Sequence, residues 1–192
     1  MNWLVWSSFF HSDAKRNLLF YNEMLLLRQN IPNAITSLRL VALPHLVYSF
    51  NHQITLVVYA LFLFSIGTDL VDGYVARKLV SASKFGAYLD VTVDFLFISG
   101  MYLAFIIKGI YSPWVLFIIV SVFIQFILSN VYLKQTIYDP IGKYYGSLLL
   151  GGIGLTLLFS DQLVYNIVTF GIVISTLASL ISRLTYFLRQ RN

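Results

Sequence analysis

Apolar residues fall in six long runs along the chain, separated by short polar stretches. A helix needs about 20 mainly apolar residues to cross the hydrocarbon core of a bilayer, and most of the runs approach that length. We therefore predict an all-α, polytopic membrane protein with six transmembrane helices. Their expected spans are residues 34–51, 54–75, 87–107, 112–133, 145–160 and 163–187.

The fifth run is short and rich in glycine, and small residues let neighbouring helices approach closely in a membrane. We therefore expect close packing there. The glycines concerned are Gly146, Gly151, Gly152 and Gly154.

The chain before the first run mixes polar and apolar positions, and we predict an interfacial helix lying along the membrane surface there. Trp3 and Trp6 suit the headgroup zone. The first ten residues carry no preceding Lys or Arg, so we expect no signal peptide. The chain then divides into an N-terminal interfacial segment, 1–33, and a six-helix membrane domain, 34–192.

Composition strengthens the membrane interpretation. Of the 192 residues, 58% are hydrophobic and 11% are charged, whereas soluble domains carry about 25% charged residues. This excludes a disordered chain and most soluble domains. The absence of cysteine excludes a disulfide framework, a thiol nucleophile and a cysteine metal site. We interpret the net charge of +5 as basic flanks that lie beside an anionic membrane surface, rather than as a surface that binds nucleic acid.

Basic residues are distributed unevenly between the two sides that six crossings would create. Twelve of the thirteen fall on one side, and only Lys108 falls on the other. Because positively charged flanks stay in the cytoplasm, we predict that this side and both termini are cytoplasmic in a multi-pass protein of the cell membrane.

Four of the eight acidic residues lie within 26 positions, at the predicted cytoplasmic ends of the second and third runs. A carboxylate beside apolar sequence is costly unless it is paired, hydrated or bound to a metal. Residues three or four apart share a helix face, so two neighbouring helices can direct all four carboxylates into one cavity. Oxygen ligands alone suit Mg²⁺ or Mn²⁺. The four residues are Asp69, Asp72, Asp90 and Asp94.

Residues beside the aspartates suit a phosphate-bearing ligand. Arg77 and Lys78 provide positive charge, while Gly73 and Ala76 leave room for a ligand close to the backbone. Other roles remain open for single residues. An intramembrane aspartate can pair two helices or relay protons, and Gly73 or Gly86 can serve helix packing alone.

Eight residues at fixed spacing then carry a family resemblance. The pattern Asp69-x2-Asp72-Gly73-x2-Ala76-Arg77-x8-Gly86-x3-Asp90-x3-Asp94 resembles the signature of the CDP-alcohol phosphotransferase family, and the six-helix layout is similar too. The resemblance implies transfer of a phosphatidyl group from a CDP-linked lipid to a hydroxyl acceptor, with release of CMP. It also implies a homodimer.

The resemblance further implies roles for these residues. Two metal ions, Mg²⁺ or Mn²⁺, would be held by Asp69, Asp72, Asp90 and Asp94, and Asp94 would also be the candidate catalytic general base. The CDP moiety of the lipid would contact Gly73, Ala76, Arg77 and Gly86.

The acceptor alcohol is less clearly indicated. The stretch 30–39, Asn-Ile-Pro-Asn-Ala-Ile-Thr-Ser-Leu-Arg, resembles phosphatidylglycerophosphate synthases and cardiolipin synthases, which favours sn-glycerol 3-phosphate. The stretch 83–90 is more similar to members that make inositol- or serine-headed lipids. Val91-Thr92-Val93, followed by Phe95 after the last aspartate, also departs from the glycerol-phosphate pattern. Inositol phosphate or serine therefore stays open as the acceptor.

Candidate cations for an acceptor phosphate are Lys143 and Arg183, with Lys134 weaker; the alternative is that they are topology anchors. Arg39 either reaches a substrate phosphate or snorkels to the interface. The three histidines are scattered, and we expect no catalytic role for them. Two rivals of other classes are a small cation transporter or channel subunit and an inactive lipid-binding scaffold.

Overall fold

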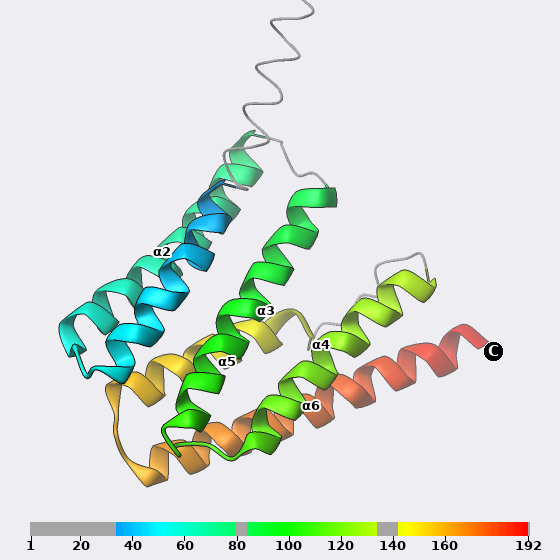
Figure 1. Ribbon diagram of the computed structural model, residues 1–192. Helices are drawn as coiled ribbons and strands as arrows, with labels where there is room; N and C mark the ends of the chain where they lie inside the picture. The colour runs from blue at the N-terminus through cyan, green and yellow to red at the C-terminus, as the bar shows by residue number, and fades with distance from the viewer. Residues whose placement is uncertain (1–33, 80–83, 134–141, 192) are drawn as a thin grey trace, which may run out of the picture.

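The computed structural model describes residues 34–79, 84–133 and 142–191, and this part of the chain is entirely helical apart from short loops (Figure 1). A first helix, which carries no label in Figure 1, covers residues 34–51. The labelled helices follow in chain order, α2 (Thr55–Leu79), α3 (Lys84–Ile107), α4 (Pro113–Leu133), α5 (Gly142–Leu158) and α6 (Gln162–Arg191). The predicted interfacial helix within 1–33 lies outside the described residues.

Each of the six apolar runs is a helix, as predicted, but three helices extend beyond the apolar sequence. Helix α2 continues to Leu79, α3 begins at Lys84 and α6 continues to Arg191. Lys, Arg, Leu and Gln are good helix formers, so the helical backbone does not stop where the hydropathy falls. The hydrophobic pattern thus located the helices. It placed the ends of α2 and α6 about four residues too early and the start of α3 three residues too late.

Two helix segments, Tyr88–Ile107 and Gln162–Ser182, are long and apolar enough to cross a membrane. Shorter apolar helices cover Thr55–Val71, Pro113–Leu128 and Tyr144–Leu158. Many large apolar side chains also face outward, including Leu56 and Phe117, which are 81% and 74% exposed. These features fit a membrane protein, whereas six complete crossings remain a prediction.

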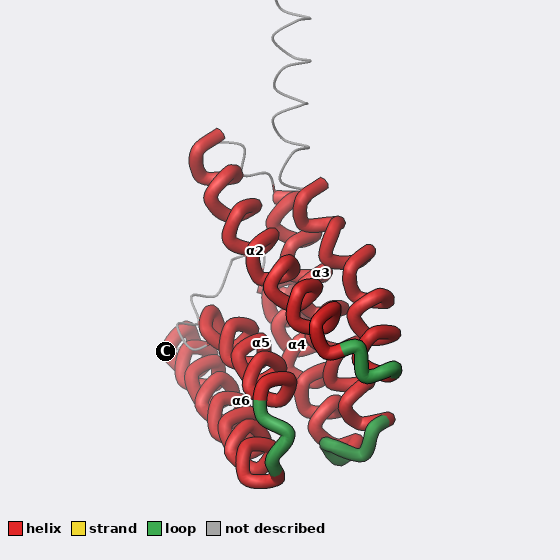
Figure 2. Tube along the Cα trace, turned by 90° about the vertical axis from the view of Figure 1, so that its left-hand side faces the viewer, coloured by secondary structure: helices red, strands yellow, loops and turns green. Residues whose placement is uncertain are grey.

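The helices form a bundle in which three short loops lie at the same end (Figure 2). These loops cover residues 52–54, 108–112 and 159–161. Helix α3 packs against α4 and α5, and α6 packs against α4 and α5. The end of α2 and the beginning of α3 are therefore at the opposite end of the bundle from Lys108, which follows α3.

Local chemistry ends the helices at these loops. After α3, Gly109 has φ +74°, its N–H donates to Ile106 O, and Ile110 N–H donates to Phe105 O. This pair of hydrogen bonds around a left-handed residue is the Schellman motif. At the start of α6, Asp161 Oδ1 accepts from Leu163 N–H at 3.1 Å and caps the helix.

Two glycines of α5 pack closely against neighbouring helices. A Cβ added to Gly152 would lie 2.7 Å from the Tyr102 hydroxyl, and one added to Gly154 would lie 3.2 Å from Phe62. The expected close approach along α5 is thus confirmed at these two positions. It is wrong for Gly146 and Gly151, where an added Cβ would meet nothing within 4 Å. Gly151 is exposed, and Gly146 borders open space beside Asp94.

Candidate metal centre

Three aspartates from two helices meet near the end of the bundle opposite the three loops. Asp69 lies on α2, and Asp90 and Asp94 lie one turn apart on α3. One carboxylate oxygen from each lies within 4.8 Å of those from the other two. Their side chains are 38%, 44% and 41% exposed, respectively, so water reaches all three. This arrangement offers several carboxylate oxygens to one ion that enters from solvent.

Arg39 of the first helix contacts all three carboxylates. Its Nη1 lies 3.0 Å from Asp69 Oδ1 and also pairs with Asp94 Oδ1, while Nη2 lies 3.1 Å from Asp90 Oδ1. The arginine side chain is only 4% exposed. The guanidinium group therefore forms the inner wall of the cluster, and the carboxylates lie closer to solvent.

The first helix presents Arg39 through a regular stripe of buried positions. Thr36, Arg39, Ala42, Leu46 and Ser49 are buried and follow one another at spacings of three and four. These spacings place them on one face of an α-helix. An arginine in such a stripe must find a counter-charge, because an unpaired buried charge is very costly.

The helical spacing likewise directs the α3 carboxylates. Asp90 and Asp94 are four residues apart and contact the same guanidinium group. Thr92, halfway between them, is exposed, and its hydroxyl donates to Tyr88 O at 2.7 Å. One face of α3 therefore carries the two aspartates, while Thr92 lies on the outer surface.

Two cavities adjoin the aspartates. A cavity of about 120 Å³ is lined by Arg39, Asp69 and Asp94, with Gly146 and Ser147 contributed by α5. A second cavity, of about 200 Å³, is mainly apolar and includes Asp94 at its lining. Phe95 and Phe123, which stack with ring centroids 3.7 Å apart, line this second cavity. Asp94 thus borders both a partly polar space and a mainly apolar one.

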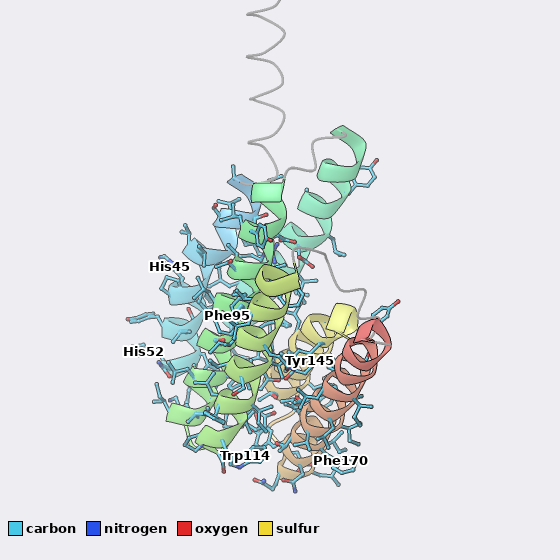
Figure 3. All side chains as sticks on the ribbon, turned by 90° about the vertical axis from the view of Figure 1, so that its right-hand side faces the viewer. His45, His52, Phe95, Trp114, Tyr145 and Phe170 are labelled. Carbon is cyan, nitrogen blue, oxygen red and sulfur yellow. The ribbon has the colours of Figure 1, made fainter. Side chains whose placement is uncertain are left out.

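The donor set fits a hard divalent cation. Carboxylate oxygens are the ligands that Mg²⁺ and Mn²⁺ prefer, and the separations within 4.8 Å are those of oxygens around one ion. His45, on the first helix, and His52, in the loop that follows it, point outward from the bundle (Figure 3). Both are exposed. His11 lies outside the described residues, and the expectation that the histidines have no catalytic role stays a prediction.

Other residues of the predicted site cannot be added to this geometry. The side chains of Asp72, Gly73, Ala76, Arg77, Lys143 and Arg183 lie outside the described part of the structure, although their backbones belong to α2, α5 and α6. Gly86 lies in the first turn of α3. Their roles stay predictions.

Sequence comparison covers most of the helical region. The family model for CDP-alcohol phosphatidyltransferases matches residues 29–183, which include all of the aspartates described above. The chain belongs to the CDP-alcohol phosphatidyltransferase family. The resemblance seen in the eight-residue pattern is therefore confirmed at the level of the family.

Individual relatives match a shorter region. The chain is 38% identical over 76 residues to a CDP-diacylglycerol–glycerol-3-phosphate 3-phosphatidyltransferase of Pseudomonas fluorescens. It is 35% identical over 68 residues to the protein of that name from Yersinia enterocolitica. It is 41% identical over 71 residues to a cardiolipin synthase (CMP-forming)/mitochondrial hydrolase fusion protein of Schizosaccharomyces pombe.

These alignments cover only part of each protein. They span 36%, 34% and 35% of this chain, and 37%, 37% and 12% of the respective relatives. The chain thus matches little more than a third of the length of the two glycerol-3-phosphate relatives. No solved structure matches the chain.

The part of the site that the sequence analysis missed is the position of Arg39. Neither of the two alternatives, contact with a substrate phosphate or snorkelling, includes its three ion pairs. The helical spacing of positions 36, 39, 42, 46 and 49 could have indicated it, because this spacing places Arg39 on the face of the first helix that is buried in the structure. The partners could not be read from the sequence, because they lie 30 to 55 residues away on other helices.

Proposed function

We propose that the chain transfers a phosphatidyl group from a CDP-linked lipid, CDP-diacylglycerol or an ether analogue, to sn-glycerol 3-phosphate and releases CMP. The observation that carries the proposal is the convergence of Asp69, Asp90 and Asp94 within 4.8 Å in a member of this family. The names of two relatives, both glycerol-3-phosphate 3-phosphatidyltransferases, favour this acceptor. Together they make the chain a phospholipid-synthesis enzyme.

The proposed metal ligands are Asp69, Asp72, Asp90 and Asp94, for two ions of Mg²⁺ or Mn²⁺. Such ions would neutralise the pyrophosphate and stabilise CMP as the leaving group. The CDP moiety is assigned to Gly73, Ala76, Arg77 and Gly86. Support for these assignments comes from the helical spacing and the exposed carboxylates, which are accessible to a nucleotide from the water side.

Asp94 is the proposed general base. In the reaction the acceptor hydroxyl oxygen forms a bond to the lipid-linked phosphorus, the phosphoanhydride bond breaks, and CMP departs with its electron pair. The hydroxyl proton must go to a nearby base, and a positioned carboxylate can accept it. The position of Asp94 between the partly polar and the mainly apolar cavity suits a group that lies between an aqueous acceptor and a lipid.

For the membrane arrangement we propose six crossings in the cell membrane, with the aspartates and both termini at the cytoplasmic face, and a homodimer. Support comes from the three loops grouped at one end of the bundle and from Lys108 at that end, against twelve basic residues assigned to the other. Insertion of a cysteine beside Lys108, followed by labelling of intact cells with a membrane-impermeant reagent, tests this orientation.

The purified full-length protein provides the test of the reaction. With CDP-diacylglycerol and one acceptor at a time, we expect CMP release with sn-glycerol 3-phosphate, and loss of release in excess EDTA. Release with inositol phosphate or serine alone would replace the proposed acceptor. Full turnover in EDTA would contradict the metal assignment, and a protein that releases CMP with none of these acceptors would contradict the activity.

A second prediction concerns the acceptor phosphate, which must be held apart from the pyrophosphate because like charges repel. Lys143 and Arg183 are the proposed clamp. A charge-assisted contact contributes about 1.5–3 kcal/mol, so Lys143→Gln and Arg183→Gln should each raise the acceptor KM about 10- to 100-fold. The KM for the CDP-lipid should stay nearly unchanged.

Lys108→Gln is the matched control for these two variants, because it removes one basic residue from the loop between α3 and α4, at the end of the bundle away from the start of α5. Initial rates with acceptor and CDP-lipid varied separately give both constants. An unchanged acceptor KM in both Lys143→Gln and Arg183→Gln would show that these residues serve topology instead.

A further inference from the structure

Arg39 joins carboxylates that belong to different helices. The first helix supplies the arginine, α2 supplies Asp69, and α3 supplies Asp90 and Asp94. The ion pairs span 30 to 55 residues of sequence. One guanidinium group therefore connects all three helices at the level of the cluster.

The guanidinium group is suited to fixing the spacing of several carboxylates. It is planar and rigid, and its N–H donors point in set directions, whereas a lysine ammonium is a flexible point charge. Nη1 serves Asp69 and Asp94 and Nη2 serves Asp90, each through Oδ1. Each carboxylate has a second oxygen besides the one that faces Arg39.

Burial differs sharply between the arginine and its partners. The Arg39 side chain is 4% exposed, while the three carboxylates are between 38% and 44% exposed. A cation from solvent therefore reaches the carboxylates on the side away from Arg39. Arginine and cation can thus occupy opposite sides of the same three groups.

Charge favours the same arrangement. Three carboxylates within 4.8 Å repel one another, and a positive group on the inner side reduces this repulsion. The pairing also compensates the burial of the arginine itself, which would otherwise be an isolated charge.

We propose that Arg39 is a positioning residue, which holds Asp69, Asp90 and Asp94 at the spacing that a divalent cation requires. The inference rests on the proposed metal site and adds to it a residue from a helix that carries no ligand. Groups that orient metal ligands typically change metal affinity 10- to 100-fold when they are replaced.

Mn²⁺ binding to the purified full-length protein tests the proposal without any substrate. Titration followed by the electron paramagnetic resonance signal of free Mn²⁺ gives the dissociation constant for the wild type, Arg39→Gln and Arg39→Lys. We expect Arg39→Gln to bind about 10- to 100-fold more weakly than the wild type. Arg39→Lys should recover part of this loss, because it keeps the charge but not the rigid fork.

Two comparisons make the titration decisive. Lys108 is distant from the cluster, and its Nζ donates to Asn51 O at 3.0 Å. Lys108→Gln therefore removes a cation that does not contact the aspartates, and this variant should bind Mn²⁺ like the wild type. If Arg39→Gln does not fold, as judged by gel filtration and thermal unfolding, Arg39→Lys decides the question alone. This variant keeps a counter-charge for the aspartates, and wild-type affinity in it would overturn the proposal.

The remaining outcomes separate this inference from the metal site itself. Unchanged affinity in a folded Arg39→Gln variant would reduce the arginine to a link between helices. Tighter binding would make it a competitor of the cation, and would also overturn the proposal. A wild-type protein that binds no Mn²⁺ would overturn both the metal site and the role of Arg39.

Discussion

The bundle handles polar groups in two different ways, at the carboxylate cluster and among the tyrosines farther along the helices. The cluster consists of Arg39, Asp69, Asp90 and Asp94, with charged and partly exposed carboxylates. Toward the opposite end, neutral hydroxyl groups pair inside the protein. Tyr111 Oη lies 2.5 Å from Thr156 Oγ1, and the Tyr59 hydroxyl donates to Leu157 O at 3.1 Å.

The difference follows from the cost of each kind of group in an apolar interior. A hydroxyl needs one or two hydrogen bonds, which a neighbouring helix can supply, so the tyrosines can be buried permanently. Carboxylates need water, a counter-charge or a metal, so they remain at an accessible end. The comparison teaches that the tyrosine region supports the fold, whereas the carboxylate region retains the capacity to bind a ligand.

The largest expected effect is on the cluster. Asp90→Asn keeps the shape of the side chain and removes the charge of a proposed ligand, so CMP release should fall by more than about 100-fold, beyond the loss typical of outer-shell groups. Thermal unfolding in detergent should change little, because the side chain is 44% exposed.

Thr92→Val is the matched control on the same helix, since Thr92 faces outward and bonds only to its own turn. It should keep nearly full CMP release. If Asp90→Asn turns over normally at ordinary metal concentration, Asp90 is not a primary metal ligand. The carboxylate cluster would then not differ from the tyrosine region in the way proposed.

The sequence alone predicted the carboxylate side of this contrast and the helices that carry both regions. Helical periodicity placed Asp90 and Asp94 on one face, and the apolar runs located all six helices, because both depend on local spacing. The contacts of Arg39 were not predictable in this way, since they depend on how the first helix packs against α2 and α3. The same holds for the pairing of Tyr111 with Thr156, 45 residues apart.

The next effect concerns packing in the tyrosine region. Gly152→Ala would place a Cβ 2.7 Å from the Tyr102 hydroxyl and 2.9 Å from Val168 Cγ1. Tyr102 is fully buried, and its hydroxyl donates to Leu149 O, so it has little room to move. We expect a loss of about 1–3 kcal/mol in the free energy of unfolding, typical of an overpacked core.

Gly151→Ala is the control, because its added Cβ meets nothing within 4 Å. It should leave stability unchanged or raise it by up to about 1 kcal/mol through helix propensity. Melting temperatures of the two variants side by side provide the measurement. Equal melting temperatures would mean that α5 and its neighbours are not held as closely as the structure indicates.

The smallest expected effect is that of a single hydroxyl group. The Thr156 hydroxyl donates to Gly152 O at 2.7 Å, so Tyr111 is the donor in the bond between Tyr111 and Thr156. Tyr111→Phe removes this bond and should lower the free energy of unfolding at pH 7 by about 1 kcal/mol. CMP release by the folded variant should be unchanged, because the residue is remote from the aspartates.

The pH dependence of the same variant checks the cause. Burial raises the pKa of the Tyr111 phenol above its ordinary value of about 10, and this residue lies in the loop between α3 and α4. Above that pH the unfolded chain releases the proton before the folded protein does, so the wild type loses stability as the pH rises. Phenylalanine cannot ionise, and the stability difference between wild type and Tyr111→Phe should therefore narrow above about pH 10. Melting temperatures from pH 7 to 11 measure it, and a constant difference would show that the Tyr111 hydroxyl is not buried in the folded protein.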